Sequence, residues 1–142
     1  MSAMSQQELF DTLSGLALFA DLSRPQVEAV AHQMTEESYP TGQRILRQGF
    51  TGTGFYVIVE GEVAIKIDGD EIARLGKGDF FGEMSILLGE PPVADVVTTR
   101  QLRALHLGGP ELEGFLRENP SVMYRMLKSI ALRLRNANRW RS

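Results

Sequence analysis

Residues 38–83 decide the fold class, and they run SYPTGQRILRQGFTGTGFYVIVEGEVAIKIDGDEIARLGKGDFFGE. The segment is dense in glycine, and its apolar residues form short stretches that often alternate with polar ones. This pattern is typical of β-strands separated by tight turns. With the residues that follow, the expected strands are Ile45–Leu46, Tyr56–Val59, Val63–Ile67, Ile72–Leu75, Val93–Thr99 and Leu102–Leu107.

Two turns in this region connect neighbouring strands. Asp68-Gly69-Asp70 predicts a hairpin, because an Asp-Gly pair tolerates the positive φ angles that two-residue hairpin turns need. Gly61-Glu62 predicts a second tight connection. At least six short strands joined in this way favour an antiparallel barrel or sandwich.

Helical patterns lie on both sides of the strands. Before them, Ser23 is the expected N-cap of a helix with Pro25 in its first turn, ending near Thr35. After them, a short helix from Pro110 is expected to end near Asn119, and a longer one with an apolar face follows. The sequence therefore predicts one α+β domain, mainly β, over residues 1–142. Its expected parts are helices at 7–34, a β-barrel at 38–107 and helices at 110–140.

Composition limits the classes of protein. The chain has 142 residues, 43% of them hydrophobic, which is enough for one core and too few for two comfortable domains. It has no cysteine, which excludes disulfides and thiolate metal sites and agrees with a cytoplasmic location. We expect no signal peptide, because no basic stretch and apolar run open the sequence, and no membrane span, because the apolar runs are short.

Charge is distributed unevenly. Residues 121–142 carry six basic groups and no acid, although the whole chain has a net charge of −3. The cations are Arg125, Lys128, Arg133, Arg135, Arg139 and Arg141. A solvated final helix explains them, and a partner or an anionic surface is the alternative. The acidic remainder and the lack of a recognition module argue against nucleic acid.

The chemistry is concentrated in residues 75–91, LGKGDFFGEMSILLGEP. An apolar strand ends in glycines, and a Gly-Glu pair then opens a short apolar segment of one or two helical turns. The backbone N–H groups at the start of a helix have no partner within it, and together with the helix dipole they form a seat for phosphate. Gly82 would let a ligand approach closely, and Glu83 would accept hydrogen bonds from sugar hydroxyls.

These residues resemble those of a known family. The sequence is similar to the cyclic-nucleotide-binding domains of cAMP-dependent kinase regulatory subunits, catabolite activator proteins and cyclic-nucleotide-gated channels. The similarity covers almost the whole chain, and spaced glycines together with Phe-Gly-Glu make it specific. It rests on Leu18–Ser23, Gly42, Ile45, Gly49, Gly52, Phe55-Tyr56, Gly61 and the stretch Phe80–Leu87, which resembles the family's phosphate-binding cassette.

The resemblance implies a jelly-roll barrel with a cassette at residues 81–95 and cAMP or cGMP as its ligand, with no metal. Glu83 would bind the ribose 2′-hydroxyl, and the N–H groups from about Gly82 to Ile86 would hold the cyclic phosphate. The residues expected to bind ligand are Phe81, Gly82, Glu83, Met84, Ser85, Pro92, Val93 and Ala94.

The sequence departs from the family where an arginine pairs with the phosphate. Pro92 stands at that position, and Val93 replaces a residue that often has a hydroxyl. Asp95 would repel the phosphate if it faced the pocket, and Thr53 replaces a common aspartate. The lost charge-assisted hydrogen bond is worth about 1.5–3 kcal/mol, which weakens binding on the order of 10- to 150-fold. The basic side chains that could substitute are Arg44, Arg47, Arg74, Lys77 and Arg100.

Two functions therefore remain open from the sequence. One is a cytoplasmic cyclic-nucleotide sensor that signals by movement of its C-terminal helix. The other is a nucleotide-independent module for protein interaction, or for homodimerisation through that helix. An enzyme is not expected, because no nucleophile–base pair or metal constellation stands out. His32 and His106 are interpreted as packing or surface residues, and Trp140 as a frayed end or a lid over the base.

Overall fold

The computed structural model describes residues 5–50 and 54–138. Its packing divides the chain into two compact units. One unit is formed by Ala31–Leu112, here called the β unit. The other, the helical unit, combines the chain up to Val30 with the chain from Glu113 onward. Thr53 and Trp140, which entered the sequence analysis, lie outside the described residues.

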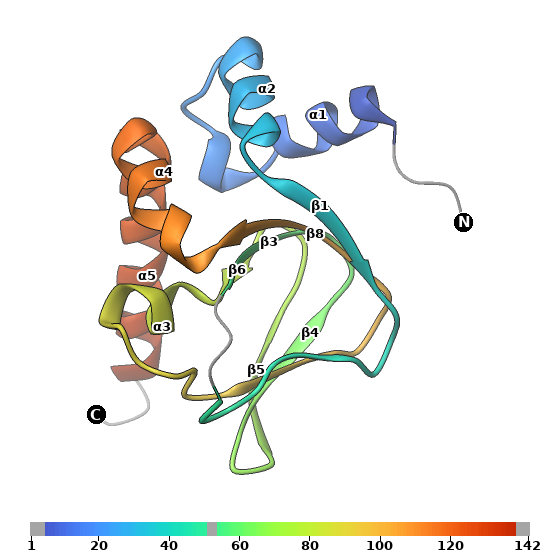
Figure 1. The fold of residues 1–142 in the computed structure, drawn as a ribbon, viewed down its shortest axis with the longest axis vertical. Coiled ribbons are helices and arrows are strands. Elements are labelled where there is room, and N and C mark those ends of the chain that lie inside the picture. The colour runs from blue at the N-terminus through green and yellow to red at the C-terminus, as the bar shows by residue number, and fades with distance from the viewer. Residues whose placement is uncertain (1–4, 51–53, 139–142) are drawn as a thin grey trace. The chain divides into compact units, whose positions relative to one another are not determined.

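The β unit contains two four-stranded antiparallel sheets (Figure 1). The first has the order β1-β8-β3-β6 and the second the order β2-β7-β4-β5. Their strands are β1 (Thr35–Tyr39), β2 (Arg44–Leu46), β3 (Gly54–Glu60), β4 (Val63–Ile67), β5 (Asp70–Leu75), β6 (Phe80–Phe81), β7 (Asp95–Thr98) and β8 (Leu102–Gly108). The expected mainly-β jelly-roll fold is confirmed, but as a sandwich of two sheets and not as a closed barrel.

The core of the β unit lies between the sheets. It is made of apolar and aromatic side chains from both of them: Leu46, Tyr56, Ile58, Val63, Phe81, Val96, Leu102 and Ala104. Successive side chains of a strand point to opposite faces, so Tyr56 and Ile58 face this core while Phe55 and Val57 face the other side of the sheet. Nearly all of β3 is buried, which explains why its sequence is continuously apolar and does not alternate.

The hairpin between β4 and β5 has the predicted turn. Asp68 and Gly69 have φ angles of 53° and 85°, so both adopt the left-handed conformation. A two-residue turn of this kind matches the twist of the strands it joins. The prediction from the Asp-Gly pair is confirmed.

The observed strands differ from the expected ones in several places. β1 begins at Thr35, where the sequence analysis ended a helix, because Thr35–Tyr39 pairs along its whole length with β8. The expected strand at 93–99 shortens to β7, since Pro92 and Val93 precede its first pairing with β4. The two-residue strand β6 was not expected, and it pairs with β3.

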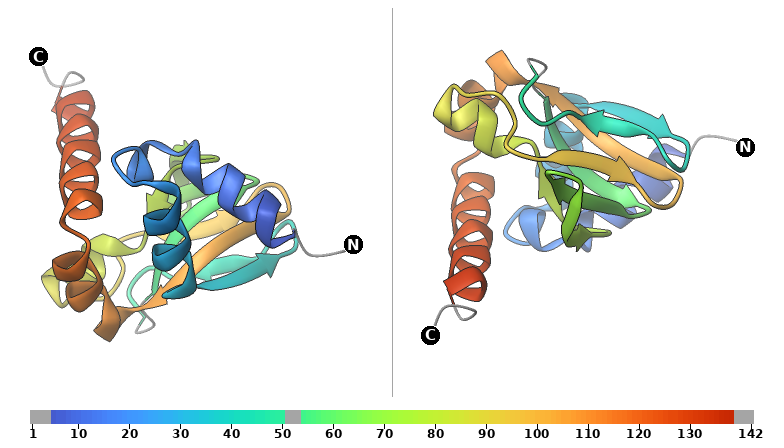
Figure 2. Two further views of the ribbon diagram at one scale, coloured as in Figure 1. Left: turned by 90° about the horizontal axis from the view of Figure 1, so that it is seen from above. Right: turned by 90° about the horizontal axis from the view of Figure 1, so that it is seen from below.

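The helical unit contains residues from both ends of the described chain. Its elements are α1 (Gln6–Ser14), the 3-10 helix η1 (Ala17–Phe19), α2 (Arg24–His32), α4 (Leu112–Glu118) and α5 (Pro120–Asn138), and η1 packs against α5. The first residue of α4 and the last two residues of α2 fall in the β unit. The 19-residue α5 runs as one uninterrupted helix (Figure 2).

Ser23 caps α2 as predicted. Its Oγ accepts from the Gln26 N–H at 3.4 Å, and the Gln26 Oε1 accepts from the Ser23 N–H at 2.8 Å. This reciprocal pair satisfies two N–H groups at the start of the helix.

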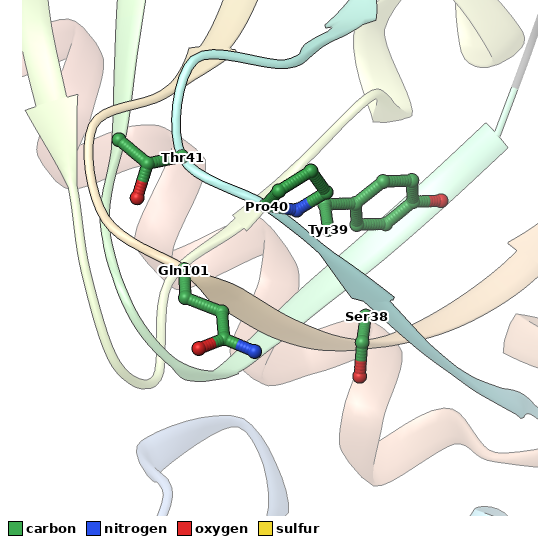
Figure 3. A pocket seen from close by; sticks show the side chains of 5 residues that line it. All are labelled: Ser38, Tyr39, Pro40, Thr41 and Gln101. Carbon is green, nitrogen blue, oxygen red and sulfur yellow. The ribbon is translucent and has the colours of Figure 1, made fainter. Parts of the chain in front are cut away.

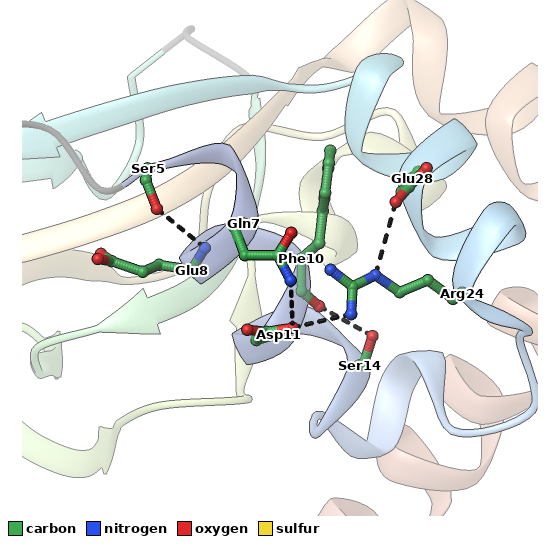
Figure 4. A network of polar contacts seen from close by, with 8 residues as sticks. All are labelled: Ser5, Gln7, Glu8, Phe10, Asp11, Ser14, Arg24 and Glu28. Atoms are coloured by element: carbon green, nitrogen blue, oxygen red, sulfur yellow. Dashed lines mark hydrogen bonds and ion pairs between the residues drawn. The ribbon is translucent and has the colours of Figure 1, made fainter.

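Ion pairs connect segments of the helical unit. Arg24 donates to Asp11 at 2.8 Å and also lies 3.5 Å from Glu28 (Figure 4). Arg125 of α5 donates to both carboxylate oxygens of Asp21, at 2.7 and 2.8 Å. The hydrogen bond from Arg125 holds the pKa of the Asp21 carboxyl below its usual value. This bidentate pair joins α5 to the segment after η1.

Candidate functional site

The cassette begins where β6 passes into the short helix α3 (Glu83–Leu88). Gly82 is the N-cap of α3 and has a φ of 93°. A Cβ at this position would overlap the carbonyl oxygen of Gly54, at the start of β3. Only glycine therefore fits here, and the first turn of α3 is held directly against the end of β3.

Glu83 is the first residue of α3, and only 7% of it is exposed. Burial of a carboxylate is costly unless polar groups surround it. The first N–H groups of α3 have no acceptor within the helix, and a negative charge is favoured at this end of a helix. Ser85 is equally buried, and its Oγ donates to the Gly82 carbonyl at 3.3 Å. The first turn therefore combines a buried acid with N–H groups that have no acceptor within the helix, an arrangement suited to a ligand with sugar hydroxyls and a phosphate.

The other predicted residues differ in their surroundings. Phe81 is buried in the core, and its ring stacks on Tyr56 with centroids 4.8 Å apart. Met84 is half exposed on α3, and Val93 is half exposed in the segment that returns from α3 to β7. Phe81 thus belongs to the core of the β unit directly before the cassette, and its contact with a ligand stays a prediction.

The return segment, residues 92–95, lies against a turn formed by residues 47–50. Pro92 is buried, and its carbonyl accepts from the Gly49 N–H at 2.9 Å. The turn is closed by the Phe50 N–H, which donates to the Arg47 carbonyl at 3.1 Å. The cassette therefore contacts two places in this part of the β unit: Gly82 lies against Gly54 at the start of β3, and Pro92 is bonded to Gly49 of the turn.

Asp95 also belongs to this contact. Its Oδ1 accepts from the Gln48 N–H at 2.7 Å, and its Oδ2 lies 3.8 Å from the Nε of Arg44. The sequence analysis raised the case in which Asp95 faces the pocket and repels a phosphate. In the structure this carboxylate instead accepts the Gln48 N–H of the 47–50 turn, and its other oxygen lies near the Arg44 guanidinium of β2.

Two of the five basic side chains named as substitutes for the arginine are in ion pairs. Arg44 pairs with Asp95, and Arg74 lies 3.0 Å from both Glu62 and Glu71. Hydrogen bonds from Arg74 lower the pKa of Glu71. Arg47 differs, because its guanidinium lies over the ring of Phe50, 4.5 Å from the centroid.

A polar cluster within the first sheet was missed by the sequence analysis. The Tyr39 hydroxyl donates to Glu37 at 2.7 Å, and the Nδ1 of His106 lies 3.8 Å from the same carboxylate. The His106 ring packs on Tyr56, with centroids 4.8 Å apart, so the interpretation of His106 as a packing residue agrees with the structure. Burial raises the pKa of both Tyr39 and Tyr56. The strands β1, β3 and β8 that carry these residues are far apart in sequence, and strand pairing brings them together.

An open hollow of about 420 Å³ lies at the end of β1 (Figure 3). It is lined by Ser38, Tyr39, Pro40, Thr41 and Gln101. None of these residues belongs to the cassette.

Neither a metal site nor a membrane-spanning helix occurs among the described residues. Between residues 5 and 138, gap excepted, no three His, Cys, Asp or Glu side chains gather as a metal site requires. None of the helices described there has the length and hydrophobicity that a bilayer crossing demands.

The family model for the cyclic nucleotide-binding domain matches residues 36–119, more than half of the chain. The chain belongs to the cyclic nucleotide-binding domain family. This confirms the resemblance inferred from the glycines and the Phe-Gly-Glu motif, and it places the chain in a family of ligand-binding domains.

Known relatives agree with this assignment. The chain is 32% identical over 103 residues to the cAMP-dependent protein kinase type II regulatory subunit of Drosophila melanogaster, an alignment that covers 69% of this chain and 27% of that protein. The catabolite activator protein of Thermus thermophilus has a similar structure, with a TM-score of 0.76 and 30% identity, over 86% of this chain and 60% of that one.

A second solved structure shares only its fold with this chain. It is the regulatory subunit of a cAMP-independent protein kinase A from Trypanosoma brucei, with a TM-score of 0.75 and 23% identity, over 87% of this chain and 44% of that one. The chain thus spans only part of each of these three proteins.

Proposed function

We propose that this chain is a regulatory domain that binds a cyclic nucleotide, cAMP or cGMP, at the cassette. The observation that carries the proposal is the buried carboxylate of Glu83 at the start of α3, directly after a left-handed Gly82. The Drosophila relative is named for its dependence on cAMP, which supports the same ligand class.

Each part of the first turn of α3 has a role in this proposal. Glu83 accepts a hydrogen bond from a ribose hydroxyl, and the N–H groups from Gly82 to Ile86 hold the cyclic phosphate. Pro92 offers no guanidinium and no N–H group. We expect an affinity on the order of 10- to 150-fold below that of a site that keeps a phosphate-binding arginine there.

Signalling requires a second conformation. A nucleotide shifts the position of α5 only if it binds the protein with different affinity in two conformations that differ in where α5 lies. The cassette and α5 belong to different units of the chain.

We expect Glu83→Gln to weaken nucleotide binding by on the order of 10- to 150-fold, because the substitution removes a charged hydrogen-bond acceptor and leaves the side-chain shape. Isothermal titration calorimetry of the chain with cAMP and then cGMP measures this change. Glu90→Gln is the matched control, since Glu90 is an exposed acid of the same segment, and its affinity should stay that of the unmodified chain.

Two results would contradict the proposal. One is the absence of saturable binding of either nucleotide at millimolar concentration. The other is equal weakening by Glu83→Gln and Glu90→Gln, which would show a general charge effect. In either case the cassette would be a structural remnant.

One observation favours a second function, a nucleotide-independent dimerisation module. α5 exposes the large apolar side chains of Met123, Leu127 and Leu134, which with the half-buried Ile130 follow alternating steps of four and three residues. That spacing is the seam of a two-stranded coiled coil. The opposite side of α5, with Val122 and Met126, is already buried. A second copy of the chain is the partner that such a seam fits.

If this second function holds, Leu127→Glu converts a dimer to a monomer, because it places a charge in the seam. Light scattering after size-exclusion chromatography gives the mass. Leu132→Glu is the control, since Leu132 is an exposed leucine of the same helix outside the seam. A chain that is monomeric without any substitution would exclude the module.

A further inference from the structure

The ligand proposed above carries a negative charge on its cyclic phosphate, and the described part of the cassette contains no basic side chain between Phe81 and Asp95. A charge-assisted hydrogen bond from a guanidinium is about twice as strong as a neutral one. A cation that binds the phosphate must therefore come from outside the cassette, and the other elements of the β unit supply candidates. The contacts of each basic side chain decide which one can.

Five basic side chains of the β unit are engaged with acids. They are Arg44 with Asp95, Arg74 with Glu62 and Glu71, Arg103 with Glu60, and two whose charges act on a carboxylate, Lys66 on Glu71 and Arg100 on Glu62. Movement of any of them to a ligand would break or weaken these interactions.

Lys77 is excluded by its position. It belongs to a turn in which the Gly78 N–H donates to the Ile58 carbonyl at 2.8 Å. Ile58 is four residues further along β3 than Gly54, which abuts the start of α3. At the rise of a strand this separation is roughly 13 Å.

Arg47 is not paired with an acid of the described chain, and it lies on a turn that contacts the cassette. Among the described residues no carboxylate lies at ion-pair distance from it, and its guanidinium is held over the ring of Phe50. It opens the 47–50 turn, whose Gly49 N–H donates to the carbonyl of Pro92. A guanidinium stacked on an aromatic ring keeps all its donors free at its edge.

The turn that carries Arg47 is fixed by three contacts. Asp95 accepts from the Gln48 N–H at 2.7 Å, and Pro92 accepts from the Gly49 N–H at 2.9 Å. The Gln48 side chain exchanges two hydrogen bonds with Asp68, at 2.9 and 3.0 Å. These hydrogen bonds hold the turn in place beside the return segment of the cassette. Because the turn is already ordered, Arg47 loses less entropy on binding.

We propose that Arg47, on the turn that Asp95 and Pro92 hold against the cassette, supplies the cation for the ligand's phosphate. This inference rests on the proposed function, since it needs a nucleotide in the cassette. It assigns a role to Asp95 as well, as a positioning residue for the turn.

We expect Arg47→Ala to weaken binding of cAMP or cGMP on the order of 10- to 150-fold. Arg47→Lys should recover part of the loss, because it restores the charge without the planar fork. The affinity should also depend less on salt in Arg47→Ala, which has lost an interaction between charges. Calorimetric titrations at low and moderate salt measure both variants against the unmodified chain.

Arg100→Ala is the matched control, since it removes one exposed guanidinium from the same unit away from the 47–50 turn. Unchanged binding in Arg47→Ala, with weakened binding in Glu83→Gln, would overturn the role of Arg47 and leave the proposed function standing. Weaker binding in Arg100→Ala than in Arg47→Ala would overturn it too. No binding by the unmodified chain would overturn the proposed function itself.

Discussion

Gly82→Ala should lower the free energy of unfolding by about 2–5 kcal/mol, among the largest effects of any single substitution in this chain. An L-residue in the left-handed conformation costs about 1–2 kcal/mol. The added Cβ also overlaps the carbonyl oxygen of Gly54, and overpacking of this kind typically costs about 1–3 kcal/mol more. Urea denaturation followed by circular dichroism measures the change.

Gly89→Ala separates the two causes. Gly89 ends α3 with a φ of 66°, and no atom lies within 4 Å of the position that a Cβ would take. This variant carries the conformational cost without the overlap, so we expect a loss of about 1–2 kcal/mol. Equal losses in the two variants would show that the contact between Gly82 and Gly54 does not matter for stability.

The contact with Gly54 explains why residue 82 is a glycine, whether or not a ligand binds. From the sequence, the glycine was assigned to the close approach of a phosphate. The structure shows that glycine is required even without a ligand, because the backbone of β3 occupies the space. A domain that had lost its nucleotide would therefore still keep Gly82, and its presence alone does not distinguish the two proposed functions.

Local signals in the sequence predicted much of the fold. The hairpin at Asp68-Gly69 and the cap at Ser23 each depend on residues within a few positions of one another. The family could be recognised because its glycines fix turns and Phe-Gly-Glu fixes a strand-to-helix junction, both of which are local features. The helices at 110–140 were predicted because Pro110 and Pro120 mark where they begin.

Contacts across long sequence distances could not be predicted in the same way. Asp95 and Gln48 are 47 positions apart, and nothing in either segment shows that the carboxylate accepts the turn's N–H group. The sequence therefore gave no reason to prefer Arg47 over the four other basic residues. The strand β6 was missed because two residues are too few for any alternation to be visible.

Phe81→Ala should lower the free energy of unfolding by about 3–5 kcal/mol, the range for loss of a buried aromatic ring. The ring lies between the sheets, where it stacks on Tyr56 with an interplanar angle of 13°. Its removal leaves a cavity that the paired strands β3 and β6 cannot close without breaking their register. Phe50→Ala is the matched control, because the Phe50 ring is 56% exposed, and its loss should cost about 1 kcal/mol or less.

A milder variant, Phe81→Leu, tests whether Phe81 binds ligand, as the family resemblance implied. A ring that touches nucleotide would, on truncation to leucine, change the affinity for cAMP or cGMP more than it changes stability. If the ring only supports the cassette, Phe81→Leu changes stability more than it changes affinity. The substitution keeps most of the buried apolar volume and leaves Gly82 and Glu83 in place. We expect the second result, because Phe81 is buried and its face is already covered by Tyr56. Weakened binding with unchanged stability in Phe81→Leu would instead place the ligand between the two sheets.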